Sequence, residues 1–390
     1  MKYMGHKGRI VKAIRAQVAR FTADAHTLCD AFCGSAAVAW DLAEQFDKRI
    51  LAGDLQSFAT ARAAAIVTRT EPINDFGFID RWFARANALV DCVKSVQRVP
   101  QSPSKELKWQ INSSRDAILR ARTYVLKTLS KRLPRTESPW PVTLAYGGYY
   151  FSLDQALTLD ALRATLPRTH TERVVTLSAL IGAASKCSAS PGHTAQPFGL
   201  GDASLPHVIE AWSRSIFNYV RAEIEQIAPR HAQVQGETRV SSWENLLDQL
   251  APGDVVFCDP PYSDVQYSRF YHVLETLSRG KAIEVSGSGR NPPFSERPAS
   301  EFSRISEAKE EAEWLLLFAA ERELRLVITF PVSRQSNGLS ALTFSRNARK
   351  YFANVDDEEV ASIFSSLGGN GTNGHRPARA ERVERIICCY

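Results

Sequence analysis

Residues Thr27–Trp40 read TLCDAFCGSAAVAW, an apolar run that passes through a glycine turn into a helical pattern. The run predicts a β-strand over 27–32, and the small residues behind Gly34 predict the start of a helix. Small residues at this place let backbone amides approach a ligand closely at a helix N-terminus. The stretch lacks the third glycine of a dinucleotide fingerprint, so an ordinary tight turn explains it equally well on its own.

Four further apolar runs end in polar or glycine-bearing loops, which is typical of parallel strands. They are RILAGD at 49–54, DVVFCD at 254–259, LRLVITF at 324–330 and ERIICCY at 384–390. Helical patterns separate them, namely AAVAWDLAEQF, SSWENLLDQL and SEAKEEAEWLLLFAAERE. Strands that alternate with helices predict an open α/β sheet with helices on both faces.

This alternation lapses over residues 81–229, which we expect to form an inserted, mostly helical domain. Within the insertion, SSRDAILRARTYVLKTLSKRL predicts an amphipathic helix. Its apolar side consists of Ile118, Val125, Leu129 and Leu133. Its basic side chains on one stripe are Arg120, Lys127 and Lys131. A solvated face and a ridge that tracks phosphates both explain this stripe.

The composition is that of a globular protein, with 390 residues, 44% hydrophobic and 23% charged. The net charge of +6 is mild, but basic residues gather near the N-terminus and over 115–135, which favours a polyanionic partner. Seven scattered cysteines predict a reducing compartment, and their spacing is no zinc signature, so we expect no metal site. No apolar run approaches the roughly 20 residues of a membrane span. We therefore expect a soluble cytoplasmic protein.

Asp54 follows Gly34 by about 20 residues, at the end of the next expected strand, where nucleoside-binding sheets hold ribose hydroxyls. The sequence contains no Gly-Lys-Ser/Thr phosphate loop, so the bound nucleoside need not carry a triphosphate. A cofactor with a ribose and no pyrophosphate fits this combination. S-adenosylmethionine is the obvious candidate.

The stretch FCDPPY at 257–262 leaves its apolar run through one carboxylate, two prolines and an aromatic ring. Each proline forces an extended conformation on the residue before it, which holds the Asp259 carboxylate and the Pro260 carbonyl as acceptors for an exocyclic amine. A base stacked on an exposed Tyr262 ring would gain about 1–3 kcal/mol. Methyl transfer to the amine then depends mainly on orientation. The plain alternative is a proline-rich strand exit with a surface tyrosine.

Four motifs, KYMGHKGRI at the N-terminus, DAFCGSAAVAW, ILAGD and DPPY, occur in this order around the large insertion. Together they resemble the Dam-type adenine-specific DNA methyltransferases. The stretch YSDVQYSRFYHVLETL resembles the branch that includes modification enzymes of type IIS restriction systems. The resemblance implies a Rossmann-like methyltransferase fold and methyl transfer from S-adenosylmethionine to the N6 amine of adenine in duplex DNA, with the base flipped out of the stack.

The resemblance also implies roles for individual residues. The implied cofactor site consists of Tyr3, Lys7, Phe32, Gly34, Asp54 and Asp259. The implied catalytic set consists of Asp259, Pro260, Pro261 and Tyr262. We add Gln266 and Tyr267 to Arg120, Lys127 and Lys131 as candidate DNA contacts.

The resemblance divides the chain into a catalytic domain, 1–80 with 230–390, and a target-recognition insertion, 81–229. It implies double-stranded DNA as the partner, in the cytoplasm of a bacterium or in a phage setting. A cognate restriction endonuclease and other defence proteins are further candidate partners, and no membrane association is expected.

The sequence departs from the family pattern at three places. Ala36 stands where many relatives have a second glycine, His6 replaces a small residue, and Phe330-Pro331 stands where Tyr-Asn is more usual. Two other functions remain open. One is N-methylation of RNA or of protein glutamine, by enzymes whose motif usually begins with Asn. The other is DNA binding without catalysis. The basic insertion favours DNA as the substrate.

Overall fold

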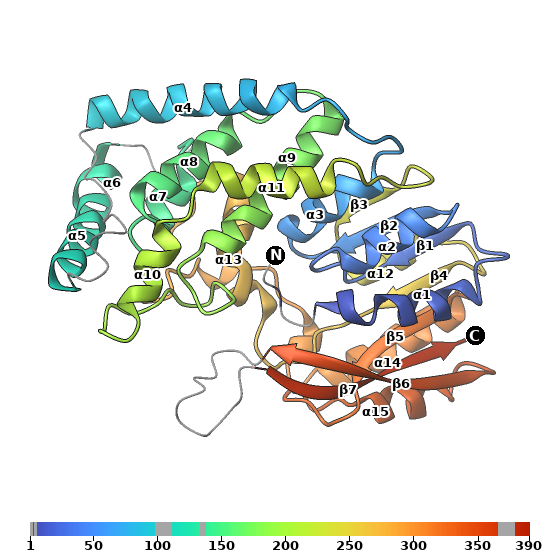
Figure 1. The fold of residues 1–390 in the computed structure, drawn as a ribbon. Helices are drawn as coiled ribbons and strands as arrows, with labels where there is room; N and C mark the ends of the chain where they lie inside the picture. The colour runs from blue at the N-terminus through green and yellow to red at the C-terminus, as the bar shows by residue number, and fades with distance from the viewer. Residues whose placement is uncertain (1–2, 4–5, 98–110, 133–137, 366–378) are drawn as a thin grey trace. The chain divides into compact units, whose positions relative to one another are not determined.

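The computed structural model describes residues 3, 6–97, 111–132, 138–365 and 379–390. The chain divides into two compact units. Unit 1 contains Ile73–Pro229 and Arg269–Arg297. Unit 2 contains Tyr3–Pro72, Arg230–Ser268 and Pro298–Tyr390. The sheet belongs to unit 2, whereas unit 1 is built of helices (Figure 1).

Unit 2 contains a seven-stranded sheet with the strand order β3-β2-β1-β4-β5-β7-β6. The strands are β1 (Thr27–Asp30), β2 (Arg49–Asp54), β3 (Glu237–Val240), β4 (Val255–Cys258), β5 (Arg325–Pro331), β6 (Val355–Ser365) and β7 (Arg379–Cys389). Strands β1 to β5 pair in parallel, and β7 pairs antiparallel with both β5 and β6. The fold is therefore α/β with a mixed, mostly parallel sheet.

Helices cover both faces of this sheet because the central strands are apolar on both sides. One face carries α1 (Val11–Ala19), α2 (Ala37–Gln45) and α3 (Ser57–Val67). The other carries α12 (Trp243–Leu247), α14 (Ala308–Glu321) and α15 (Ala341–Ala348). Three short helical turns are η1 (Lys7–Arg9), η4 (Phe294–Glu296) and η5 (Glu301–Ser303).

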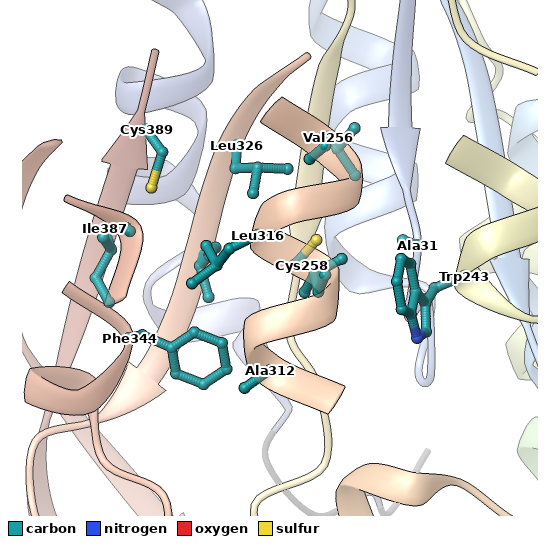
Figure 2. Close-up of a cluster of buried hydrophobic side chains, with 14 of the residues drawn as sticks. Ala31, Trp243, Val256, Cys258, Ala312, Leu316, Leu326, Phe344, Ile387 and Cys389 are labelled. Atoms are coloured by element: carbon teal, nitrogen blue, oxygen red, sulfur yellow. The ribbon is translucent and has the colours of Figure 1, made fainter. Parts of the chain in front are cut away.

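The core under α14 shows how alternate strand residues build one layer. Val256 and Cys258 of β4, Leu326 of β5 and Ile387 of β7 point to the same side and pack under Leu316 (Figure 2). This alternation follows from the two-residue period of a strand. It places the intervening residues on the opposite face, under α1 to α3.

Unit 1 consists of α4 (Gly77–Gln97), α5 (Ile111–Tyr124), η3 (Val125–Leu129), α6 (Ser130–Arg132), α7 (Pro141–Tyr146), α8 (Leu153–Ala164), α9 (His170–Cys187), α10 (Leu205–Trp212), α11 (Ile216–Ile227) and most of α13 (Tyr267–Arg279). The helices of this unit other than α6 bury apolar residues. None of the helices in the described part of the chain is both long and apolar enough to cross a membrane.

Residues 269–297 lie in unit 1, although the motif-based division assigned them to the catalytic part. Their contacts explain the placement. The Tyr150 hydroxyl lies 2.6 Å from the Thr194 carbonyl oxygen and 2.8 Å from that of Gly289. His272, buried beside Tyr146 and Tyr150, also bonds the Gly289 carbonyl, at 3.1 Å. Burial lowers the pKa of His272 to about 4, so this bond is made by a neutral ring.

The five expected strands and three expected helices are confirmed, with shifts of a few residues at their ends. The sequence analysis missed β3 and β6, which are the two edge strands. Both are short of apolar residues because an edge strand is partly open to water; β6 begins VDDEEV. The amphipathic helix of the insertion is present as α5, η3 and α6, with Ile118, Val125 and Leu129 buried. Leu133 lies outside the described residues.

Candidate active site

A cavity of about 540 Å³ opens in unit 2 at the carboxyl ends of β1, β2 and β4. The chain leaves β1 towards β2 on one side and leaves β4 towards β5 on the other. Open α/β sheets bind ligands at such a reversal, outside the carboxyl ends of the strands. The volume lies in the range of pockets for cofactor-sized molecules, about 300–1,000 Å³.

The turn after β1 forms one wall of the cavity. Gly34 has φ +44° and Ala36 has φ 67°, so two residues of the turn are left-handed. A Cβ atom at Gly34 would come within 2.6 Å of the Tyr3 hydroxyl, so a larger residue would displace the Tyr3 ring and would also strain the left-handed backbone. The expected turn is thus present, and Tyr3 packs directly over it. Phe32 stands behind it, with its ring edge-on to Phe302 at 5.7 Å.

Asp54 ties this turn to the end of β2. Its Oδ2 accepts a hydrogen bond from the Gly34 N–H at 3.0 Å, and its Oδ1 accepts one from the Gln56 N–H at 2.9 Å. The acid that the sequence singled out therefore lies in the cavity wall and is held in place by backbone amides.

Asp30, the last residue of β1, is a wall residue that the sequence analysis missed. Its side chain is buried, and Oδ1 has no hydrogen-bond partner among the described residues. Burial, followed by the nearby charge of Asp259, raises the pKa of Asp30 to about 8. The sequence pattern that could have predicted this role is a carboxylate at the last position of an apolar strand, just before the glycine turn.

The turn after β4 forms the opposite wall. Asp259, Pro261 and Tyr262 line the cavity, whereas Pro260 is buried. Asp259 Oδ1 lies 3.1 Å from Lys7 Nζ and accepts a hydrogen bond from Thr329 at 3.0 Å. Among the described residues, both of these contacts fall on the same carboxylate oxygen. The motif thus presents its acid to the cavity from a fixed position.

A residue outside the motif holds this turn. The side-chain amide of Asn337, which is fully buried, donates to the Pro261 carbonyl and to the Phe302 carbonyl, both at 3.0 Å. Asn337 belongs to the loop after β5, the strand that ends in Phe330-Pro331. Sequence reasoning noticed this loop without assigning Asn337 a task. Asn337 is a single polar residue in a polar loop, so no sequence pattern predicted that it would hold the turn.

The Tyr262 ring is half-buried, which corrects the expectation of an exposed ring. It meets Tyr267 edge-on at 6.3 Å and Phe330 edge-on at 6.4 Å. Lys7 Nζ lies 5.9 Å from the centre of the ring. Neighbouring rings cover its edges because the turn folds back over the end of the sheet. The ring still lines the cavity.

Charges in the cavity are strongly one-sided. Lys7 is the one cation among its described lining residues. The carboxylates in the lining are Asp30, Asp54, Glu244, Asp259 and Glu301. Burial raises the pKa of Asp259 to about 6; Lys7 opposes this shift and Glu384 adds to it. Burial lowers the pKa of Lys7, but Asp259 and Glu384 together outweigh that effect and raise it.

The candidate DNA contacts lie in two places. Gln266 and Tyr267 line the cavity, but the Gln266 side chain exchanges two hydrogen bonds with the Ser300 backbone. Arg120, Lys127 and Lys131 are exposed on the helix formed by α5, η3 and α6. Within the described residues, no group of three or more His, Cys, Asp or Glu side chains could hold a metal ion.

The two other departures from the family pattern meet at the glycine turn. His6 Nδ1 lies 2.9 Å from the Ser35 hydroxyl, and its pKa is lowered, chiefly by burial. Ala36, at the position where relatives have a glycine, adopts the left-handed conformation that glycine favours. An alanine therefore adopts a left-handed conformation at this turn.

Comparison with known proteins gives two results. Residues 203–320, which include the motif at 259–262, match the model of the D12 class N6 adenine-specific DNA methyltransferases. Over 295 residues, or 74% of the chain, the sequence is 22% identical to "Modification methylase LlaI" of Lactococcus lactis subsp. lactis. The aligned part covers 40% of that relative, so the chain spans less than half of its length. These comparisons connect the chain with the D12, or Dam-type, class of N6 adenine-specific DNA methyltransferases and with LlaI as a distant homologue.

Proposed function

We propose that this chain transfers a methyl group from S-adenosylmethionine to the N6 amine of adenine in duplex DNA, in a restriction-modification or related defence setting. One observation carries the proposal. The Asp259–Tyr262 turn and the glycine turn with Asp54 lie at the same strand reversal and line the same cavity. The group that would accept a hydrogen bond from the substrate amine and the wall that would bind the nucleoside thus line one cavity. We propose that this sheet is a Rossmann-like methyltransferase fold.

The cavity suits S-adenosylmethionine by charge as well as by shape. Asp30 keeps its proton below a pKa of about 8, so four carboxylates of the described lining stand against one ammonium group, which favours a ligand with positive charge. Tyr3 and Phe32 would border the cofactor, the Gly34 turn would let its backbone approach, and Asp54 would accept from the ribose. When bound, the cofactor supplies a methyl group on a positively charged sulfur. Lys7 and Asp259 would stand at the junction with the substrate.

The residues after β4 would position the amine. Asp259 accepts hydrogen bonds through Oδ1 from Lys7 and Thr329, which leaves Oδ2 as the oxygen for the adenine amine. The sequence also offered the Pro260 carbonyl as an acceptor, but Pro260 is buried and is not among the residues that line the cavity, so Asp259 is the acceptor that we propose. Tyr262, whose ring lines the cavity, would stack on the base. Holding the amine in this way aims its lone pair at the methyl group, and the proton can leave after attack.

We further propose that the insertion 81–229 recognises the target DNA while 1–80 and 230–390 carry the chemistry. The support is the exposed basic stripe of Arg120, Lys127 and Lys131. Replacing all three with glutamine should remove about three phosphate contacts. The slope of log affinity against log salt concentration should then become shallower by about three. An unchanged slope would show that these side chains do not contact DNA phosphates. Gln266, tied to Ser300, is the weaker candidate for a base contact.

The decisive test uses the full chain and S-adenosylmethionine labelled on its methyl group. The label is followed into duplex DNA, RNA and protein in parallel. We expect label in DNA alone, recovered as N6-methyladenine after digestion. Label in RNA or protein alone would favour the other N-methyltransferases. DNA binding without any transfer would favour a non-catalytic relative.

A further inference from the structure

Three charged side chains meet behind the β4 exit. Lys7 Nζ lies 3.1 Å from Asp259 Oδ1 and 2.6 Å from Glu384 Oε2. The side chains of Lys7, Asp259 and Glu384 are 5%, 17% and 1% exposed, so water screens them little. They come from η1, from the end of β4 and from β7. No motif in the sequence included Glu384.

Glu384 is the most firmly held of the three. It lies within β7, opposite Pro331 of β5 and opposite Val360 of β6, so its backbone is inside the sheet. Asp259 instead follows its strand, and Lys7 belongs to a short helical turn near the N-terminus. Because strands in the middle of a sheet move least, Glu384 supplies the reference point for the other two.

The distances show how Lys7 is shared. Its ammonium group lies closer to Glu384 than to Asp259, and it contacts Asp259 at Oδ1, the oxygen that Thr329 also contacts. A buried lysine with Asp259 as its sole carboxylate partner would be drawn further onto that carboxylate. Glu384 therefore limits how closely Lys7 can approach the acid of the motif.

We propose that Glu384 is a positioning residue for methyl transfer: it anchors Lys7 so that Lys7 fixes Asp259 through Oδ1 and leaves Oδ2 directed at the substrate amine. This inference rests on the proposed function, because it assigns Asp259 to the amine. It adds a carboxylate that touches neither substrate nor cofactor and acts through Lys7.

The same arrangement has an electrostatic consequence. The titratable groups that face Asp259 are Lys7 from η1, Glu384 from β7, Asp30 from β1 and the Cys258 thiol beside it. The charge of Glu384 adds to burial in raising the pKa of Asp259, and Lys7 opposes it. Removing that charge lowers the pKa of Asp259. The acid side of the pH–activity profile, where Asp259 takes up a proton, should then move to lower pH.

The test compares Glu384→Gln with Glu359→Gln in the full chain. Glu359 is a matched control: it is a carboxylate on β6 of the same strand pair and forms an ion pair with Arg385, but its side chain is 52% exposed. We expect Glu384→Gln to lower kcat about 10-fold with little change in KM for DNA, since misplacement of a reacting group affects the chemical step. Its acid limb should move down by about half a pH unit or more. Glu359→Gln should match the wild type.

Two further measurements keep the result interpretable. Glu384→Asp keeps the charge but shortens the reach, so it should lower kcat while its acid limb stays at the wild-type pH. Binding of S-adenosylhomocysteine, followed by calorimetry from pH 5 to 8, reports ionisation in the cavity without methyl transfer, with Asp259 titrating near pH 6 and Asp30 near pH 8. It should show the same downward shift in Glu384→Gln alone.

The outcomes separate the two claims. A wild-type kcat and pH profile in Glu384→Gln would refute the positioning role. So would an equal loss in both glutamine variants together with lowered thermal stability, because that pattern means the strand pair needs both carboxylates to fold. A wild-type chain that labels no substrate would refute the proposed function, and the binding profile would still decide whether Glu384 controls Asp259.

Discussion

The exits of β1 and β4 line the same cavity, but their polar groups are held differently. After β1, Asp30 is buried with an unpartnered oxygen, and Ala36 adopts a left-handed conformation. After β4, Asp259 is paired with Lys7 and Thr329, and Asn337 secures the Pro261 carbonyl. The first exit leaves one buried carboxyl oxygen available for a hydrogen bond, as the binding wall of a charged cofactor requires. The second is restrained, as a reaction that depends on orientation requires.

The largest effect should follow from breaking the β4 exit itself. Asp259→Ala removes the acceptor for the amine and should lower methyl transfer at least about 100-fold. Tyr262→Ala removes a stacking face worth about 1–3 kcal/mol, so it should lower methyl transfer roughly 5- to 150-fold. DNA affinity should fall much less. Transfer is measured with labelled cofactor and affinity by a gel-shift titration.

Asp264→Ala is the control for this pair, because Asp264 is exposed two residues beyond Tyr262. It should retain wild-type transfer. If Asp259→Ala and Tyr262→Ala lost DNA binding as fully as transfer, these residues would support the fold instead of the reaction.

A smaller effect should follow from loosening the same exit from outside the motif. Asn337→Ala leaves two buried carbonyl groups without their donor, which should cost about 1–3 kcal/mol of unfolding free energy. Methyl transfer should fall about 10-fold because the turn is less restrained. Chemical denaturation and steady-state kinetics measure the two quantities.

Ser336→Ala provides the comparison for Asn337, since Ser336 accepts one exposed backbone hydrogen bond from Asp264. It should change the unfolding free energy by less than about 0.5 kcal/mol. Equal effects of the two substitutions would mean that the loop as a whole, and not the Asn337 amide, holds the turn.

At the end of β1, replacing the buried Asp30 carboxyl with an amide should instead stabilise the protein. The pKa of Asp30 is about 8 in the folded chain and about 4 when unfolded, so between these values only the folded chain keeps the proton. Stability therefore falls as pH rises from about 4 to 8. Asp30→Asn does not titrate, so it should gain about 1 kcal/mol or more over the wild type by pH 8.

Thermal and denaturant unfolding of both proteins from pH 5 to 8.5 would reveal this difference in slope. The gain should be smallest at pH 5 and grow with pH. Parallel stability curves would show that the Asp30 carboxyl does not hold a proton in the folded chain.

The smallest effect concerns the backbone of the glycine turn. Ala36→Gly should stabilise the chain by about 0.5–1 kcal/mol, because φ 67° strains an alanine by more than glycine loses in chain entropy. Ala43→Gly, in the last turn of α2, should have the opposite sign and cost about 1 kcal/mol. Denaturant unfolding measures both, and a destabilising Ala36→Gly would show that the turn tolerates alanine without strain.

Much of the fold could be predicted from the sequence because central strands are continuous apolar runs. Five apolar runs and the helices between them were predicted, since strands buried on both faces must be apolar throughout. The edge strands β3 and β6 carry mostly polar residues on their open sides, so no pattern separated them from loops. The motifs at Gly34, Asp54 and Asp259–Tyr262 were likewise visible as short local signals.

The sequence by itself determined which residues could accept, stack or turn, because those properties belong to single side chains and to their neighbours along the chain. Tertiary structure alone decided which groups meet. Lys7 and Glu384 are 377 positions apart, and Asn337 reaches Pro261 across 76 positions. The burial that raises the pKa of Asp30 is also a property of the packed sheet. Distance, burial and charge balance arise only when the strands come together, because each depends on residues that the chain brings from far away.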